Sequence, residues 1–413
     1  MQYFSFIAAN ARLLGFGFAL AAFSSFGQTF YISLFGAEIR ETFALSHGGF
    51  GAAYSFATLS SAACLVWLGR WIDEIDLRVW TALLCSGLAC ACLLMWWSPA
   101  VTVLIAAIFG LRLFGQGLLS HASSASMARY FEIGRGRALS IAGLGHPAGE
   151  ALLPLPAVAL AAAIGWRDTW AIVAALMLFA ALPLAMWLLR GHPDRQRAWL
   201  ERNVAPNART LGHADGSWTR TEVLRDRVFY LLLPASLAPS YVMTGFFFHQ
   251  AHLAQTKGWP LALIAGGFTA WALTSVVAAL VAGDLVDRHG ATRVMPFALV
   301  PMCAGLIVLA TAASPPVAPV YLGLAGVSQG VHMTVQGALW AEIYGVRFIG
   351  AIRALTTGLA VLATALAPVT MGWLIDAGVS MEAIAVGSVT ATALCIAFAL
   401  RGLRLHRQRG TAA

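Results

Sequence analysis

Three ionisable side chains lie inside apolar stretches of this sequence. A charge in such surroundings is energetically costly and often has a function. Arg112 lies in VTVLIAAIFGLRLFGQGLLSHAS, and Glu150 follows His146 by four residues in GLGHPAGE. An arginine guanidinium binds carboxylates and phosphates, whereas a carboxylate or an imidazole can accept and release a proton. These residue types indicate a site that binds a small anion and exchanges a proton.

The composition indicates which solvent surrounds these charges. Of the 413 residues, 59% are hydrophobic and 11% charged, whereas about 25% of a soluble domain is charged. A membrane-spanning helix needs ~20 apolar residues, and the long continuous runs here favour helices over a barrel. We expect an all-α membrane protein with twelve spanning helices, the first of them not cleaved, near residues 14–36, 47–69, 79–98, 101–126, 138–164, 169–190, 229–253, 260–283, 294–313, 317–343, 352–375 and 381–401.

The basic residues are distributed unevenly among the loops that join these runs. Of 26 Lys and Arg residues, 22 fall on one side, Arg40, Arg167 and Lys257 fall on the other, and Arg112 lies within the membrane. Positive residues mark cytoplasmic loops, so both termini are predicted to lie in the cytoplasm, with the chain in the plasma membrane (the inner membrane of a bacterium). Because the net charge of +8 follows the loops, it gives no reason to expect a nucleic-acid partner.

A short motif occurs once in each half of the chain. GRWID, with Gly69 and Asp73, follows the second run, and GDLVDRHGATR, with Gly283 and Asp287, follows the eighth. Both pairs are 214 residues apart, and such a constant offset indicates duplicated halves. We therefore expect two pseudo-symmetric six-helix bundles joined by a cytoplasmic linker, with the domains at residues 1–190, 191–227 and 228–413.

These two segments resemble the loop motif G-x-L-x-D-R-x-G-R-R of the major facilitator superfamily. The N-terminal copy keeps Gly69, Asp73 and a late Arg78, and the C-terminal copy matches at Gly283, Leu285, Asp287, Arg288, Gly290 and Arg293. The resemblance implies a secondary active transporter that works by alternating access, acts as a monomer in the lipid bilayer and carries a small molecule. It also implies a conformational switch in which the motif aspartate pairs near a helix start, with the candidates Gly69, Asp73, Gly283, Asp287 and Arg288.

The fifth run suggests one branch of that superfamily. RGRALSIAGLGHPAGEALLPLPAVALAAAIGWRDTW is similar to the fifth-helix region of the monocarboxylate and oxalate–formate transporters. Together with Arg112 as the embedded cation, this likeness favours a small, monocarboxylate-like organic anion as the class of substrate. The eighth run, PLALIAGGFTAWALTSVVAALVAG, has none of the charge that this branch carries there, so the substrate itself does not carry over.

Polar residues recur at helical spacing on the first, fourth, seventh and tenth runs, which line the central cavity in the family that the chain resembles. Stripes at i, i+3 and i+4 place such residues on one helix face. Polar contacts between helices are the alternative explanation. For four stripes on the four expected helices we favour a cavity, whose predicted substrate-binding residues are Gln28, Tyr31, Arg112, Gln116, Gln329, His332 and Gln336.

Arg112 and Glu150 lie at similar depths in neighbouring runs. At 1.5 Å per residue, they are ~16 and ~18 Å into their helices, near the middle of a core that is ~30 Å thick. Two interpretations are open. In one the residues form a structural ion pair. In the other a substrate anion displaces Glu150 from Arg112, and Glu150 or His146 takes up a proton, which makes H⁺ the coupling ion.

Other classes of function receive less support from the sequence. There is no HExxH, no Cys/His metal set, no paired acidic motif and no nucleotide loop, so we expect neither an enzyme nor a cofactor or metal site. Proton-driven efflux of a small drug or metabolite is the alternative within transport. A membrane sensor that transports nothing is the alternative of another class.

Overall fold

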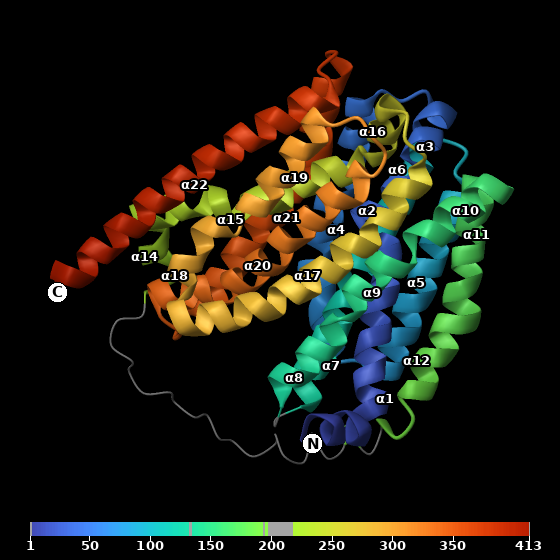
Figure 1. Cartoon of the computed structure of the whole chain (residues 1–413). Coiled ribbons are helices and arrows are strands. Elements are labelled where there is room, and N and C mark those ends of the chain that lie inside the picture. The colour runs from blue at the N-terminus through green and yellow to red at the C-terminus, as the bar shows by residue number, and fades with distance from the viewer. Residues whose placement is uncertain (1, 132–133, 193–194, 197–217, 413) are drawn as a thin grey trace. The chain divides into compact units, whose positions relative to one another are not determined.

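The computed structural model describes residues 2–131, 134–192, 195–196 and 218–412, and these residues form helices and no strands (Figure 1). The predicted all-α class is therefore confirmed. The chain forms two compact units, one from Met1–Glu38 with Phe56–Leu211 and one from Ile39–Ser55 with Gly212–Ala413. Residues 39–55, which the sequence places in the first bundle, thus pack with the second unit. The predicted division at residues 191–227 stays a prediction.

The first unit combines long helices with several short helical segments that follow one another closely. Its elements are α1 (Gln2–Phe23), η1 (Ser24–Gly27), α2 (Thr29–Ile32), η2 (Ser33–Phe35), α3 (Gly36–Phe43), α4 (His47–Leu68), η3 (Gly69–Asp73), α5 (Leu77–Trp97), α6 (Val101–Gly110), η4 (Leu111–Leu119), α7 (Ser120–Tyr130), α8 (Arg135–Gly143), α9 (Gly145–Leu152), α10 (Pro154–Ile164), α11 (Trp166–Leu176), η5 (Met177–Ala181) and α12 (Leu182–Leu188). The residues of α3 and α4 are shared with the second unit.

The second unit contains longer, less interrupted helices. Its elements are α14 (Arg220–Arg225), α15 (Arg227–Phe248), α16 (Gln250–Lys257), α17 (Leu261–His289), α18 (Ala291–Val294), η6 (Met295–Phe297), α19 (Val300–Thr311), α20 (Val317–Tyr344), α21 (Ile349–Asp376) and α22 (Met381–Ala412).

Within the described residues, eleven helical segments are long and apolar enough to cross a membrane. They account for eleven of the twelve predicted runs. The remaining run, 317–343, forms the 28-residue helix α20, which is long enough to span a bilayer. It differs from the others because Gln329, His332 and Gln336 interrupt its apolar surface.

The first predicted run is not one continuous helix. α1 ends at Phe23, the tight turn η1 follows, and Gln28 is extended at φ −82° and ψ 154°. The local sequence favours this break, because serine hydroxyls compete for backbone hydrogen bonds and glycine weakens a helix. Ser24 Oγ donates to the carbonyl oxygen of Ala21 at 2.7 Å. The break releases backbone carbonyls in the middle of the predicted span.

The fourth predicted run contains a wide π-helical segment, η4, between α6 and α7. π-helical turns are rare and often occur at functional sites. This segment includes both Arg112 and Gln116. It crosses η1 very closely, because a β-carbon on Gly115 would come within 2.7 Å of the Gly27 Cα atom. Glycine at both positions therefore permits the contact.

In the second unit, α17 and α20 lie side by side along their length (Figure 1). Their contact also depends on glycine. A β-carbon on Gly330 would come within 2.8 Å of the Ala279 nitrogen, and one on Gly326 within 2.9 Å of the Trp271 Cα atom. Close backbone approach of this kind is typical of helix pairs in membranes. It fixes the position of α20, which carries three of the predicted binding residues.

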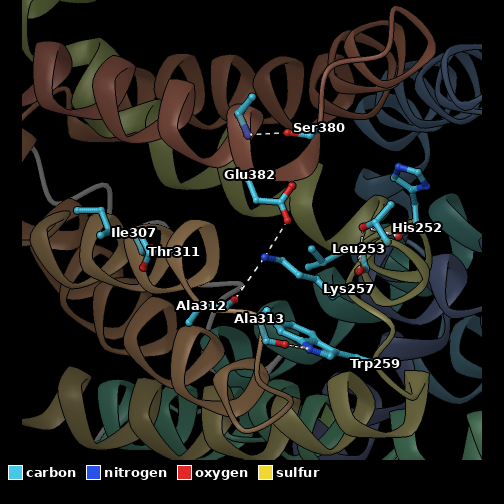
Figure 2. A network of polar contacts seen from close by, with 12 residues as sticks. His252, Leu253, Lys257, Trp259, Ile307, Thr311, Ala312, Ala313, Ser380 and Glu382 are labelled. Atoms are coloured by element: carbon cyan, nitrogen blue, oxygen red, sulfur yellow. Dashed lines mark hydrogen bonds and ion pairs between the residues drawn. The ribbon is translucent and has the colours of Figure 1, made fainter.

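The loops at one end of the second unit are joined by Lys257, the last residue of α16 (Figure 2). Its Nζ atom lies 2.8 Å from Oε1 of Glu382 at the start of α22 and donates to the Ala312 carbonyl oxygen at 3.3 Å. Beside it, Trp259 Nε1 donates to the Ala313 carbonyl oxygen at 2.8 Å. These contacts connect α16, α19 and α22 within the unit.

Candidate functional site

A polar cavity of about 400 Å³ lies in the second unit between α15, α20 and α21. We call it the polar cavity. Its size falls in the range of pockets for small molecules. Its lining residues are Ser236, Leu237 and Ser240 from α15, Gln329, His332, Met333, Gln336, Gly337 and Trp340 from α20, and Arg353, Thr356, Thr357 and Ala360 from α21.

All three binding residues predicted on the tenth run line this cavity. Gln329, His332 and Gln336 recur at intervals of three and four residues, so they share one face of α20. His332 is 8% exposed and hydrogen-bonds to the backbone of Ser236 on α15. The helical stripe read from the sequence thus lies in the wall of a cavity, where His332 also makes a polar contact between α20 and α15.

Two polar atoms of the cavity wall lack a protein partner. Ser236 Oγ and Gln336 Nε2 are buried, and neither has a hydrogen bond within the described part of the chain. A buried polar group without a partner costs about 1–3 kcal/mol, so such groups normally bind water or a ligand. Both atoms belong to residues that line the polar cavity, which makes it suited to a polar small molecule.

Arg353 supplies a positive charge that was not among the predicted binding residues. It lies near the start of the predicted run 352–375 and was one of the 22 basic residues assigned to the cytoplasmic side, and the structure places it on α21, in the cavity lining. Its Nη2 atom donates to the carbonyl oxygen of Gly337 on α20. The spacing of Arg353, Thr356 and Thr357 is the signal that could have revealed it, since it defines a polar helix face. Among the described residues, none that lines this cavity carries a carboxylate.

In the first unit, the break after α1 provides the contact for Arg112. The side chain is 4% exposed, and its Nη1 atom donates to the carbonyl oxygen of Gly27 at 3.1 Å. The helix does not use this carbonyl, because the amides of Tyr31 and Ile32 bond to Gln28 instead. An embedded guanidinium is thereby directed toward backbone freed by the broken helix.

His146 and Glu150 lie on α9, which packs against α1. A β-carbon on Gly145 would approach the Ala21 Cβ atom to 2.7 Å, so glycine is needed at this crossing. His146 Nδ1 lies 3.4 Å from Ser24 Oγ. Glu150 is half-buried one turn further along α9. The predicted pairing of Glu150 with Arg112 stays a prediction, as does the role of either residue on α9 in proton exchange.

The remaining binding candidates of the first unit differ in their surroundings. Gln28 and Gln116 are half-buried beside the η1–η4 crossing, where a β-carbon on Gly27 would approach the Gln116 nitrogen to 2.7 Å. Tyr31 is 2% exposed, and its ring contacts those of Phe26, Phe35 and Trp170 at centroid distances of 5.1, 5.8 and 5.5 Å. Aromatic packing alone accounts for the position of Tyr31.

The predicted switch residues lie at the ends of α4 and α17. Gly69 begins η3, and a β-carbon added there would lie 3.8 Å from the Cε1 atom of His121. A β-carbon on Gly283 would meet nothing within 4 Å. Neither glycine lies at a tight helix crossing among the described residues, and the role of both in a conformational switch stays a prediction. The backbone of Asp73 closes η3, and its side chain lies outside the described residues.

The C-terminal motif copy has a different local arrangement from the one expected. Asp287 is exposed, and Arg288 pairs with Asp284 one turn earlier, its Nη2 atom lying 2.8 Å from Oδ1. The motif glycine with a clear structural need is Gly290, which ends α17 at φ +84°. That left-handed conformation favours glycine.

Glu342 anchors the motif loop and was not anticipated from the sequence. It lies near the end of α20, and its Oε2 atom accepts a hydrogen bond of 2.6 Å from the Ala291 amide at the start of α18. Its Oε1 atom accepts one of 2.6 Å from Thr292 Oγ1. A carboxylate is favourable at a helix N-terminus. The contact joins residues 51 apart, which is why no local pattern indicates it.

Comparison with known proteins identifies the family. The sequence profile described as the Major Facilitator Superfamily matches residues 17–270 and 240–412. The chain belongs to the Major Facilitator Superfamily. The protein is therefore a multi-pass integral membrane protein and a secondary transporter of a small molecule. Among curated proteins, none matches the chain by sequence.

Two solved structures illustrate how far the superfamily fold extends over this chain. A bacterial homologue of the human lysosomal transporter Spinster, inward-facing and unoccupied, has a TM-score of 0.72 at 14% identity and covers 97% of this chain and 98% of its own. The nucleoside transporter NupG has a TM-score of 0.66 at 14% identity, with 96% and 98% covered. At such low identity these likenesses support the fold, and the substrate must be argued from the cavities.

Proposed function

We propose that this superfamily member couples the movement of a small, monocarboxylate-like organic anion to protons, as a symporter working by alternating access. The observation that carries the proposal is the composition of the polar cavity. It combines the Arg353 guanidinium with buried hydrogen-bonding groups on Ser236 and Gln336 and no lining carboxylate. Such a set favours an anion over a cation.

Arg353 has the chemistry needed to bind a carboxylate. Its guanidinium presents several N–H donors in a planar fork, and one of them is held by the Gly337 carbonyl. The remaining donors can form paired, charge-assisted hydrogen bonds with a carboxylate. Thr356 and Thr357 lie on the same face of α21 and add hydroxyl groups. A cavity of about 400 Å³ suits a small organic acid.

The first unit contributes the second part of the proposal. Arg112 is a buried cation at η4, and His146 and Glu150 are ionisable groups on α9. We assign anion recognition to Arg112 and proton exchange to Glu150 and His146, because an embedded ionisable residue in a transporter commonly belongs to a substrate or proton pathway. This assignment makes H⁺ the coupling ion and requires no cofactor.

A second candidate function is proton-driven efflux of an apolar compound. A cavity of about 600 Å³ lies between α15, α21 and α22, and its wall is mostly leucine, alanine and valine, with Tyr241, Ser388 and Thr392 among the few polar residues. We call it the apolar cavity. It suits a drug-like molecule better than an organic acid. The anion proposal and the efflux alternative therefore predict different substrates and different essential cavities.

Transport by the purified protein in liposomes distinguishes the two. An imposed pH gradient should drive accumulation of a labelled monocarboxylate in the vesicles. A protonophore, which collapses the gradient, should abolish this accumulation. Arg353→Gln should lower the rate at least tenfold, whereas Arg401→Gln, which changes an exposed arginine of α22, should not. If none of the monocarboxylates or dicarboxylates moves while a cationic dye or a sugar does, the anion proposal is wrong.

We also propose the orientation and location that the charge distribution predicts. Both termini lie in the cytoplasm, and the protein acts as a monomer in the plasma membrane, the inner membrane in a bacterium. A C-terminal fusion to a reporter that is active only in the cytoplasm should be active, and the same reporter inserted after Lys257 should not. The reverse pattern would overturn the proposed orientation.

A further inference from the structure

A second polar cavity, of about 750 Å³, lies where α17 and α20 end and where α22 nears its C-terminal end. We call it the basic cavity, and it is separate from the polar cavity, with which it shares no lining residue. The function proposed above makes no use of it. Its lining residues are Trp218, His289, Thr292, Arg293, Glu342, Ile343, Tyr344, His406, Arg407 and Arg409.

The described lining of this cavity contains more basic than acidic side chains. Three arginines face one carboxylate, that of Glu342, and two histidines add hydrogen-bonding groups. The carboxylate is already engaged, because its two oxygens accept hydrogen bonds from Ala291, at 2.6 Å, and from Thr292 Oγ1, at 2.6 Å. The other nearby acids of α17, Asp284 and Asp287, are not among the lining residues. Because Asp226 pairs with Arg409 and Glu342 offsets a second arginine, the described lining keeps a modest excess of positive charge.

One side of the cavity is held in place by a buried carboxylate outside the lining. Asp226 accepts hydrogen bonds from Arg409 Nη2 at 2.6 Å, Arg409 Nη1 at 3.0 Å and Tyr344 Oη at 3.0 Å. This paired geometry orients the Arg409 guanidinium. The Trp218 amide donates to the Tyr344 carbonyl oxygen at 2.9 Å, and the two rings lie 5.5 Å apart. The wall formed by Trp218, Tyr344 and Arg409 is thus fixed before any ligand binds.

We propose that the basic cavity binds a phosphate-bearing anion, supplied either by the headgroup of an anionic phospholipid or by a soluble phosphate ester. Arg293 and Arg407 contact the phosphate oxygens, His289 and His406 supply further N–H donors, and Trp218 and Tyr344 form the wall. Guanidinium groups match phosphate oxygens in paired hydrogen bonds. The cavity lies at the ends of α17, α20 and α22, and α17 and α22 belong to candidate membrane spans. Phospholipid headgroups are found near the ends of such spans.

The experiment uses the full-length protein in nanodiscs of phosphatidylcholine. In one arm, phosphatidylglycerol replaces part of the lipid, and native mass spectrometry counts the molecules retained by each protein. In the other arm, glycerol 3-phosphate is titrated and its dissociation constant is measured by calorimetry. Arg293→Gln/Arg407→Gln should weaken retention or affinity about tenfold or more, since charge-assisted contacts are lost. Arg404→Gln changes an exposed arginine on the same helix, outside the lining, and should bind as the wild type does.

Each outcome decides the proposal. A response in the lipid arm alone identifies the headgroup as the source, and a response in the soluble arm alone identifies the phosphate ester. Binding in neither arm overturns the proposal. An equal loss of binding in the Arg404→Gln protein also overturns it, because such a loss would mean that the anion is attracted to positive charge in general rather than to this cavity. If the double variant does not fold, His406→Gln alone replaces it, and unchanged binding by that protein contradicts the assignment.

Discussion

The carbonyl oxygen of Gly27 accepts a 3.1 Å hydrogen bond from Nη1 of Arg112, although the two residues are 85 positions apart. The contact exists because the helix is interrupted between Phe23 and Thr29, which leaves this carbonyl without a helical partner. An arginine that looked isolated in an apolar run is therefore bonded to backbone. The broken helix and the embedded charge are one structural feature.

The first prediction concerns the glycine crossing that supports this contact. Gly115→Ala should push η4 away from η1, because its β-carbon would approach the Gly27 nitrogen to 2.8 Å. We expect a loss of about 1–3 kcal/mol of stability, typical of overpacking, measured as a lower Tm in detergent. Gly136→Ala is the matched control, because a β-carbon there meets nothing within 4 Å. Equal Tm values for the two proteins would contradict the close crossing.

The second prediction separates charge from geometry at Arg353. Arg353→Lys keeps the positive charge and loses the planar fork, so the KM for a carboxylate substrate should rise about tenfold while transport remains measurable. Arg353→Gln should lose both properties and transport far less. Initial rates in proteoliposomes over a range of substrate concentrations provide the measurement. If lysine and glutamine have the same effect, the fork geometry is unimportant and only the charge matters.

A third prediction follows from Asp226, just before the first residue of α15. Burial alone would raise the pKa of this carboxyl, but hydrogen bonds from Arg409, the Val228 amide and Tyr344 outweigh burial, so the pKa lies below its ordinary value of 3.8. Its contribution to stability is therefore present above pH 3.8 and is lost as the pH falls through the folded-state pKa.

Asp226→Asn should accordingly lower stability at pH 7 by about 1–3 kcal/mol, less than a fully buried pair would lose because Arg409 is half-exposed. The difference in Tm between the two proteins should shrink as the pH falls below 4. Glu222→Gln, which changes an exposed carboxyl on α14, provides a comparison at another acid. A constant difference at every pH would show that the charge of Asp226 is irrelevant.

A fourth prediction concerns His249, which links α15 to α16. Burial lowers its pKa to about 3, a hydrogen bond to the Pro368 carbonyl partly opposes this, and His47, His252 and Arg40 lower the pKa further. The Nε2–H donates to that carbonyl at 3.0 Å, and the lowered pKa means that the ring binds a proton less readily in the folded chain than in the unfolded chain. Below its ordinary pKa of 6.5 the unfolded chain gains a proton here that the folded chain does not.

Stability should therefore decline as the pH falls from about 6.5 toward 3, and His249→Gln should flatten this decline. The measurement is the Tm of both proteins between pH 7.5 and 5. His289→Gln, at an exposed histidine near the end of α17, should leave the decline unchanged. A wild-type Tm that is flat over this interval would contradict a lowered pKa for His249 in the folded state.

The polar face of α20 shows how much of the candidate site can be predicted from sequence. Gln329, His332 and Gln336 could be placed on one face because helical periodicity is a local property, and the structure brings all three to the polar cavity. Arg353 could not be placed in the same way. Whether a residue near a helix start faces a loop or a cavity depends on which other helix packs beside it. For Arg353 that helix is α20, where Gly337, 16 residues earlier in the chain, accepts its hydrogen bond.

The sequence by itself determined the helical class, the long apolar spans and the repeated motif, because hydrophobic length and periodicity act over one helix at a time. The tertiary structure alone decided which groups those helices bring together. The carbonyl of Gly27 for Arg112, the anchor of Glu342 on α18 and the charge of Arg353 in the polar cavity all join separate helices. Such contacts depend on helix breaks, glycine crossings and side-chain packing, which no local pattern specifies.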